Sequence, residues 1–322
     1  MNSTKLISMF FTAICLFLTS CKDTKKMEYV LILHGGAGAL AAEATNDSLQ
    51  KAYTSVLEAA RDSGIKILAA GGSSMDAVEK VINMLEDCPL FNAGKGACYN
   101  FEGRVSLDAS IMDGSDLKAG AVAGVGDIKN PISAARKVLT SSPYVMLSGK
   151  GASEFAKLQG LKIEDSSYFF TERQWKAHIA GLESKKLGTV GCVALDKRGN
   201  LAAGTSTGGM MNKKWGRIGD SPVIGAGTYA NNKTCAVSCT GTGEFFIRLS
   251  VARDMSAMIE YKKSDIQSAA DEIIQKKLGE LNGQGGLIGL DSKGKAAISF
   301  NTPGMFRAYG DSNGKKFSAI FK

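Results

Sequence analysis

The run Val190-Gly191-Cys192-Val193-Ala194-Leu195-Asp196, the turn Lys197-Arg198-Gly199 and the run Asn200–Ser206 decide the fold. Two apolar stretches joined by a short turn that contains glycine predict a β-hairpin. The segment Leu287–Asn301 repeats this scheme around a second glycine-containing turn. Because the helical patterns fall in blocks of their own, the sequence favours a layered α+β fold over a parallel βαβ sheet.

The expected helices precede and follow the first hairpin. Apolar residues at helical spacing and a serine N-cap at Ser73-Ser74 predict helices over Asp47–Ile67, from Ser74 to just before Cys88-Pro89, over Glu244–Tyr261 and over Ser264–Leu278. Near the start, the β-rich run Tyr29–Leu33 leads into the glycine loop His34-Gly35-Gly36-Ala37-Gly38. The polar stretch Glu164–Lys186 lacks periodicity, and we expect it to be a flexible linker.

Composition limits the possible functions of the 322-residue chain. The formal net charge is +8, but the lysines are dispersed and often adjoin acids, and no recognition motif accompanies them. Nucleic acid is therefore not an expected partner. Cys88, Cys98, Cys192, Cys235 and Cys239 form neither a CxxC pair nor a Cys/His cluster, so we expect free thiols and no zinc.

The first residues predict export. Lys5 precedes the apolar stretch Leu6–Leu18, which is typical of a signal peptide over residues 1–20 and too short for a membrane-spanning helix. Leu18-Thr19-Ser20-Cys21 resembles the lipobox of bacterial lipoproteins. That resemblance implies lipidation of Cys21, a tether over residues 21–28 and an exported lipoprotein held at the membrane by its lipid, facing the periplasm or the outside. A plain signal peptide or an N-terminal anchor is the alternative.

Thr189 is the candidate nucleophile. A threonine hydroxyl needs an adjacent base, and a cut directly before the residue would supply one in the new α-amine, whose usual pKa of about 7.7–8.0 lies near neutrality. The expected linker ends just short of Gly188-Thr189, where such a cut would fall. The chain has only two histidines, His34 and His178, and neither is well placed to serve a serine–histidine–acid triad.

Two further groups could complete a site. Thr207 lies in a strand beside that of Thr189, and the run Thr240-Gly241-Thr242-Gly243 joins a strand to a helix, where free N–H groups could bind an oxyanion. Arg217 and Asp220 stand three residues apart in a loop. They could hold the carboxylate and ammonium of an amino acid, or they could form an ordinary surface ion pair.

These residues together resemble the plant-type L-asparaginase / isoaspartyl peptidase family of N-terminal nucleophile hydrolases. The similarity covers residues 29–322 in the family's order and rests on HGGAG at 34–38, PLFNAGKG at 89–96, GTVG at 188–191, TSTGGM at 205–210, GRIGDSP at 216–222, GAGTYA at 225–230, CTGTGE at 239–244 and NTPGM at 301–305. It implies a four-layer αββα sandwich. It also implies a precursor cut between Gly188 and Thr189 into an α chain, residues 29–188 of the hydrolase domain, and a β chain, residues 189–322.

The resemblance also implies the roles of individual residues. Thr189 would be the nucleophile, Thr207 and Asn92 would orient its hydroxyl, and Thr240 and Gly241 would form the oxyanion hole. Arg217 and Asp220, with Gly243 nearby, would bind the substrate. No cofactor is expected for catalysis, but a structural sodium ion is expected on the backbone carbonyls of Leu85, Glu86, Cys88, Phe91, Ala93 and Lys95. A homodimer of αβ units is implied as well.

The implied reaction releases L-aspartate from L-asparagine or from short β-aspartyl peptides through a β-aspartyl ester of Thr189. Two alternatives remain open at this point. A glycosylasparaginase shares the nucleophile and fold, although Gly188 before Thr189 and the run Thr207–Met210 look more like the asparaginase branch. A lipoprotein that binds amino acids without turnover is the second alternative.

Overall fold

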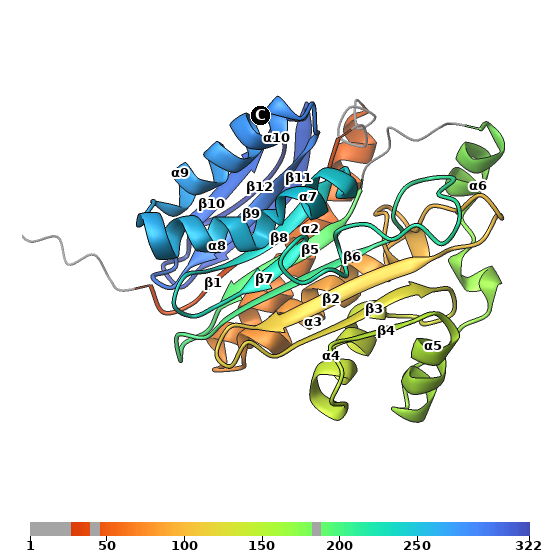
Figure 1. Ribbon diagram of the computed structural model, residues 1–322, viewed down its shortest axis with the longest axis horizontal. Helices are drawn as coiled ribbons and strands as arrows, with labels where there is room; N and C mark the ends of the chain where they lie inside the picture. Colours follow the sequence, from red (N-terminus) through yellow and green to blue (C-terminus); the bar gives the residue numbers. More distant parts are fainter. Residues whose placement is uncertain (1–26, 39–45, 182–187) are drawn as a thin grey trace, which may run out of the picture.

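The computed structural model describes residues 27–38, 46–181 and 188–322. Its strands form two sheets that pack face to face, and helices cover both outer faces (Figure 1). The predicted signal peptide and Cys21 lie outside the described residues, as do residues 182–187 at the end of the expected linker.

The larger sheet has eight strands in the order β12-β11-β1-β5-β6-β2-β3-β4. All neighbours are antiparallel except β3 and β4. Strands from before and after Thr189 interleave, since β1 lies between β11 and β5. The bounds are Val30–Ala37 (β1), Leu107–Asp113 (β2), Ala119–Val125 (β3), Met146–Ser148 (β4), Val190–Leu195 (β5), Leu201–Thr207 (β6), Gly304–Asp311 (β11) and Lys316–Phe321 (β12).

The smaller sheet has the order β10-β9-β8-β7 and is antiparallel throughout. Its strands are Thr228–Ala230 (β7), Cys235–Gly241 (β8), Gly285–Asp291 (β9) and Ala296–Phe300 (β10). Both predicted hairpins are confirmed, β5–β6 in the large sheet and β9–β10 in the small one.

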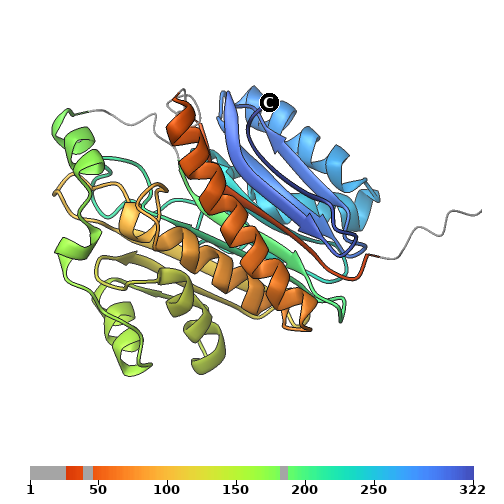
Figure 2. The same cartoon turned by 180° about the vertical axis from the view of Figure 1, so that it is seen from behind.

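The helices make the two outer layers. Figure 2 shows α2 (Asp47–Ala69) and α3 (Ser74–Glu86) lying across the large sheet, with α4 (Pro131–Ser141) and α5 (Gly149–Leu158) toward the β3–β4 edge. The small sheet is covered by α7 (Gly243–Leu249), α8 (Val251–Lys262) and α9 (Ile266–Asp271). The shorter elements are η1 (Gly94–Gly96), η2 (Ser166–Phe169), α6 (Glu172–Ile179), the π-helical η3 (Glu272–Lys277) and α10 (Leu278–Glu280).

The apolar side chains of β1 alternate between two cores, as a strand buried on both faces requires. Leu31 and Leu33 pack with the helices of the large sheet, whereas Ile32 packs with Ile288 in the core between the sheets. A third core, around Met255, joins the small sheet to its helices. Three cores separate four layers, so the predicted α+β sandwich is confirmed.

The helix start at Ser73 is confirmed in detail. The Ser73 side chain accepts from the Asp76 N–H, and the Asp76 carboxylate accepts from the Ser73 N–H, which is a capping box. Such reciprocal bonds satisfy N–H groups that the helix itself leaves unpaired. They fix where α3 begins and therefore where the chain leaves it, at the segment that leads to Asn92.

Three predicted elements were wrong in part. The expected linker Glu164–Lys186 contains η2 and α6, because Phe169 and Ala177 are buried although most of the segment is polar. The single helix expected over Glu244–Tyr261 is two helices, since Ser250 adopts a left-handed φ of 49° between them. The helix expected over Ser264–Leu278 begins after its N-cap Asp265 and continues through the π-helical η3.

Within the described part of the chain, no helix is both long enough and apolar enough to cross a membrane. The five predicted free cysteines are free, and four of them are buried.

Candidate active site

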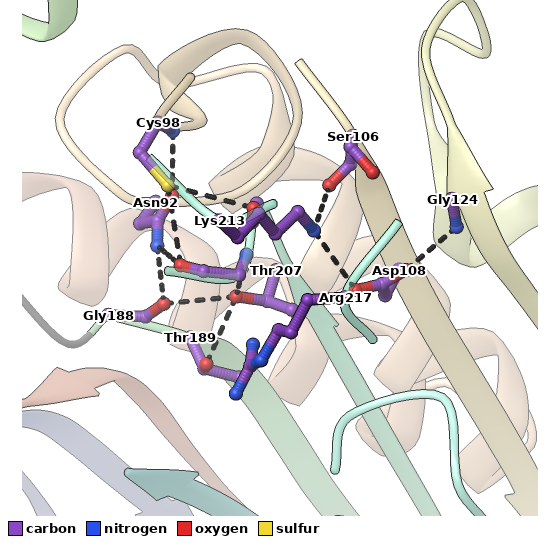
Figure 3. A network of polar contacts seen from close by, with 12 residues as sticks. Asn92, Cys98, Ser106, Asp108, Gly124, Gly188, Thr189, Thr207, Lys213 and Arg217 are labelled. Carbon is purple, nitrogen blue, oxygen red and sulfur yellow. Dashed lines mark hydrogen bonds and ion pairs between the residues drawn. The ribbon is translucent and has the colours of Figure 1, made fainter. Parts of the chain in front are cut away.

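Thr189 lies at the start of β5 and is buried, with 6% of its surface exposed. Antiparallel pairing of Val190 with Ser206 brings Thr189 next to Thr207, the last residue of β6. The Thr189 hydroxyl donates to Thr207 Oγ1 over 3.1 Å (Figure 3). The predicted pair of threonines is therefore formed by the register of the first hairpin.

The carbonyl of Gly188 accepts two hydrogen bonds at this position. Asn92 Nδ2 donates to it over 2.8 Å, and Thr207 Oγ1 donates over 3.1 Å. Thr207 Oγ1 itself accepts from the Gly209 N–H over 2.9 Å. Two donors on the carbonyl before Thr189 would stabilise negative charge developing on that oxygen.

Asn92 is held at three points. Its Oδ1 accepts from the Cys98 N–H, and its Nδ2 also donates to Gly209 O, each over 2.8 Å. A side chain on Gly208 would begin 2.6 Å from Asn92 Oδ1, so this close approach requires glycine. Asn92 Nδ2 thus donates to the carbonyl directly before Thr189, and a role of Asn92 in orienting the Thr189 hydroxyl stays a prediction.

Arg217 and Asp220 flank the other side of Thr189. Arg217 Nε and Nη2 donate to the two carboxylate oxygens of Glu244 over 2.8 and 2.9 Å. Burial raises the pKa of Asp220 to about 7, against the lowering effect of the Arg217 guanidinium. Asp220 Oδ2 is buried without a hydrogen-bond partner among the described groups. A Cβ on Gly243 would lie 2.8 Å from Asp220 Oδ1 and 2.9 Å from Arg217 Nη2. Gly243 therefore packs directly against both side chains, and a larger residue would displace them.

Of the two residues predicted for an oxyanion hole, Gly241 lines the cavity beside Thr189. Thr240 is fully buried, and its hydroxyl accepts from the Ala37 N–H of β1 over 3.2 Å. That contact ties the end of β8 to the glycine-containing end of β1.

The cavity itself is small, about 10 Å³. A space of this size holds about one water molecule. Its described lining consists of Gly188, Thr189, Thr207, Gly209, Met210, Arg217, Gly219, Asp220, Ser221 and Gly241. The predicted nucleophile and the predicted substrate clamp thus line the same small cavity.

Several residues at the site were not among those predicted from the sequence. Glu244 anchors Arg217, Ser221 lines the cavity, and Lys213 is buried against Gly209. Only Glu244 carried a usable signal, because it directly follows Gly243 at the start of a helix. Lys213 looked like one of many dispersed lysines.

His34 takes no part in the described lining of the cavity. Its Nε2 lies 3.0 Å from Ser238 Oγ between the two sheets. Burial lowers the pKa of His34 to about 3, against the effect of the Thr189 backbone, which raises it, so the ring is neutral near pH 7. This agrees with the expectation that His34 is not the base of a triad.

The expected sodium loop runs from the end of α3 through η1. A Cβ on Gly94 or Gly96 would come within 2.4 Å of Glu86 O or 2.1 Å of Phe91 O, so these carbonyls pack against glycine. Leu85 O and Ala93 O accept from backbone N–H groups of the same loop, and Cys88 and Lys95 belong to it as well. The Glu86 side chain points elsewhere, to Ser206 and Ile132, and burial raises its pKa to about 8.

A family model described as Asparaginase matches residues 27–320 of the chain. The chain belongs to this family. Isoaspartyl peptidase of Salmonella typhimurium is 45% identical over 308 residues, which cover 91% of this chain and 98% of that protein. Isoaspartyl peptidase of Escherichia coli is 44% identical, covering 91% and 96%. Isoaspartyl peptidase/L-asparaginase of Bos taurus is 41% identical over 288 residues, covering 87% and 92%.

The comparisons also correct one prediction. The expected exported lipoprotein anchored through Cys21 is wrong, because these relatives are named isoaspartyl peptidases or L-asparaginases and none is named a lipoprotein. A short apolar run followed by a cysteine was too weak a pattern to assign a location. The same names do not favour the glycosylasparaginase alternative.

Proposed function

We propose that this asparaginase-family hydrolase cleaves β-aspartyl peptides and L-asparagine to release L-aspartate, with Thr189 as its nucleophile. The observation that carries this proposal is the placement of the Thr189 hydroxyl against Thr207, in one cavity with Arg217 and Asp220. The names of the relatives support the substrate class.

The first proposed step is self-cleavage. The Thr189 oxygen attacks the Gly188 carbonyl carbon, its proton passes to the departing amide nitrogen, and an ester replaces the peptide bond. Water then cleaves the ester, leaving a Gly188 carboxylate and a free Thr189 amine. Asn92 Nδ2 and Thr207 Oγ1 already donate to the Gly188 oxygen, which carries the charge of the tetrahedral intermediate.

Turnover uses the new amine. It takes the proton of the Thr189 hydroxyl, whose oxygen attacks the side-chain carbonyl of the substrate, and ammonia or an amine leaves with that proton. Water then releases aspartate from the ester. Gly241, with Thr240 behind it, would stabilise the oxyanion. Arg217 would bind the α-carboxylate, and Asp220, whose Oδ2 lacks a partner among the described groups, would accept from the α-ammonium.

A denaturing gel and a product assay test this function. We expect wild-type protein to yield two fragments divided at Thr189, Thr189→Ala to stay as one band, and aspartate to appear from β-Asp-Leu but not from a glycosylated asparagine. Wild-type protein that stays intact yet binds aspartate would instead support a binding protein. Aspartate released only from the glycosylated substrate would support a glycosylasparaginase.

We also infer a sodium ion held by the carbonyls of the 85–95 loop, and a homodimer of αβ units. Neutral carbonyl oxygens packed on glycines suit a monovalent cation. If sodium binds there, the melting temperature should be higher in sodium chloride than in tetramethylammonium chloride of equal ionic strength. Light scattering on the eluting protein gives the oligomeric state directly.

A further inference from the structure

Lys213 is a buried cation beside the candidate active site. Only 3% of its side chain is exposed, and its Nζ donates to Ser106 O over 2.7 Å. Its ion-pair partner is Asp108 on β2, at 3.5 Å, and that carboxylate is fully buried. Burying two charges is costly and often fails to stabilise a fold. Stability alone is therefore a weak reason for burying this pair.

Asp108 is itself fixed to the sheet. Its Oδ1 accepts from the Gly124 N–H of β3 over 2.8 Å. Burial raises the pKa of Asp108, and the Lys213 ammonium lowers it. The Lys213 ammonium is thus attached to the large sheet through Ser106 and Asp108 (Figure 3).

The stem of Lys213 packs on Gly209. A Cβ on Gly209 would lie 2.7 Å from Lys213 Nζ and 3.1 Å from its Cδ, and the Gly209 φ is +76°. At the preceding residue of the same turn, a Cβ on Gly208 would meet Asn92 Oδ1 at 2.6 Å. Lys213 and Asn92 therefore both pack closely against the turn at 208–209.

This turn determines where the Thr207 hydroxyl points. The Gly209 N–H donates to Thr207 Oγ1, which in turn accepts from Thr189 and donates to Gly188 O. Gly209 O accepts from Asn92, the other donor to Gly188 O. Lys213 is not among the described residues that line the cavity, so its influence on Thr189 passes through Gly209.

We propose that Lys213, with Asp108 as its counter-ion, is a positioning residue that holds the 208–209 turn and so keeps the Thr207 hydroxyl between the Thr189 hydroxyl and the Gly188 carbonyl. This inference rests on the proposed function, because it assigns Lys213 a part in self-cleavage and in turnover. Among the described residues, Arg217 and Asp220 form no hydrogen bond or ion pair with Lys213 or Asp108, and the Asp108 charge is only a minor cause of the raised pKa of Asp220. The pair should therefore affect kcat and the cleavage rate, and leave KM unchanged.

The test uses the full chain with Lys213→Met and with the double variant Asp108→Asn/Lys213→Met. The single variant leaves a buried carboxylate without its partner and can lose stability, whereas the double variant removes both charges. Lys277→Met is the control. Lys277 forms an ion pair with Asp254 at 2.7 Å, and neither residue is among those described as lining the cavity. The measurements are the half-life of the intact band, the melting temperature, and kcat and KM for β-Asp-Leu per cleaved chain.

We expect the double variant to melt near the wild-type temperature and to cleave itself about 10- to 100-fold more slowly, the scale that displaced reacting groups cost. Its kcat should fall by a similar factor and its KM should stay within about twofold, since misplacement acts on the transition state. The proposal would be overturned if the double variant cleaved itself and turned over substrate at the wild-type rates, or if only its KM rose. Wild-type protein that does not cleave at all would overturn the proposed function instead.

Discussion

Replacing Asn92 by aspartate should slow self-cleavage without preventing it. The Gly188 oxygen accepts from Asn92 Nδ2 at 2.8 Å and from Thr207 Oγ1 at 3.1 Å. Asn92→Asp keeps the oxygen that accepts from Cys98 but turns the donor toward Gly188 into an acceptor. Loss of one oxyanion donor costs about 10²- to 10³-fold in rate, or about 2.7–4 kcal/mol. The remaining Thr207 donor should sustain slow cleavage.

The assay follows the intact chain on denaturing gels after purification, and mass spectrometry confirms a cut at Thr189. Asn83→Asp is a matched control, because Asn83 donates to Ser133 between two helices of the outer layer. Melting temperatures establish that each variant is folded. An Asn92→Asp half-life within about threefold of wild type would refute the assignment of Asn92 as an oxyanion donor, since the expected loss is far larger.

Three further predictions concern the substrate clamp and the core. Burial raises the pKa of Asp220 to about 7, so the carboxylate gains a proton as pH falls through 7. KM for L-asparagine should then rise, and it should stay flat with pH in Asp220→Asn. Glu244→Gln should raise KM about fivefold and leave kcat unchanged, because Arg217 loses the carboxylate that orders its side chain. Ordering one such side chain costs about 0.5–1.5 kcal/mol. An equal or lower KM would show instead that Glu244 competes with substrate for Arg217. His34 has its pKa lowered to about 3 by burial, so only the unfolded chain gains its proton as pH falls from 6.5. The free energy of unfolding should decline over that range, and urea titrations of His34→Gln should show a flatter decline.

Local patterns predicted the parts of the fold that local forces determine. The β5–β6 hairpin followed from its turn, and the start of α3 followed from Ser73, whose bonds lie within one helical turn. The register of that hairpin also brought Thr189 and Thr207 together. These features depend on residues close in sequence, which a single chain displays directly.

The features that the sequence did not predict depend on contacts between segments far apart in the chain. Phe169 and Ala177 are buried by packing against other elements, so the segment that contains them forms η2 and α6 despite its polar composition. Lys213 acquires its significance from Asp108, 105 positions away, and from a close approach to Gly209. No local pattern distinguishes it from a solvated lysine.

The interleaved strand order would hold the two proposed fragments together in one sheet. β1 belongs to the segment before Thr189, yet its hydrogen-bonding partners β11 and β5 both follow Thr189. A cut before Thr189 would therefore leave two fragments that can separate only if the hydrogen bonds of β1 to β11 and β5 are broken. Folding of the intact chain is unimolecular, whereas reassembly of a denatured cleaved enzyme would require two chains to meet, so its recovery should depend on protein concentration.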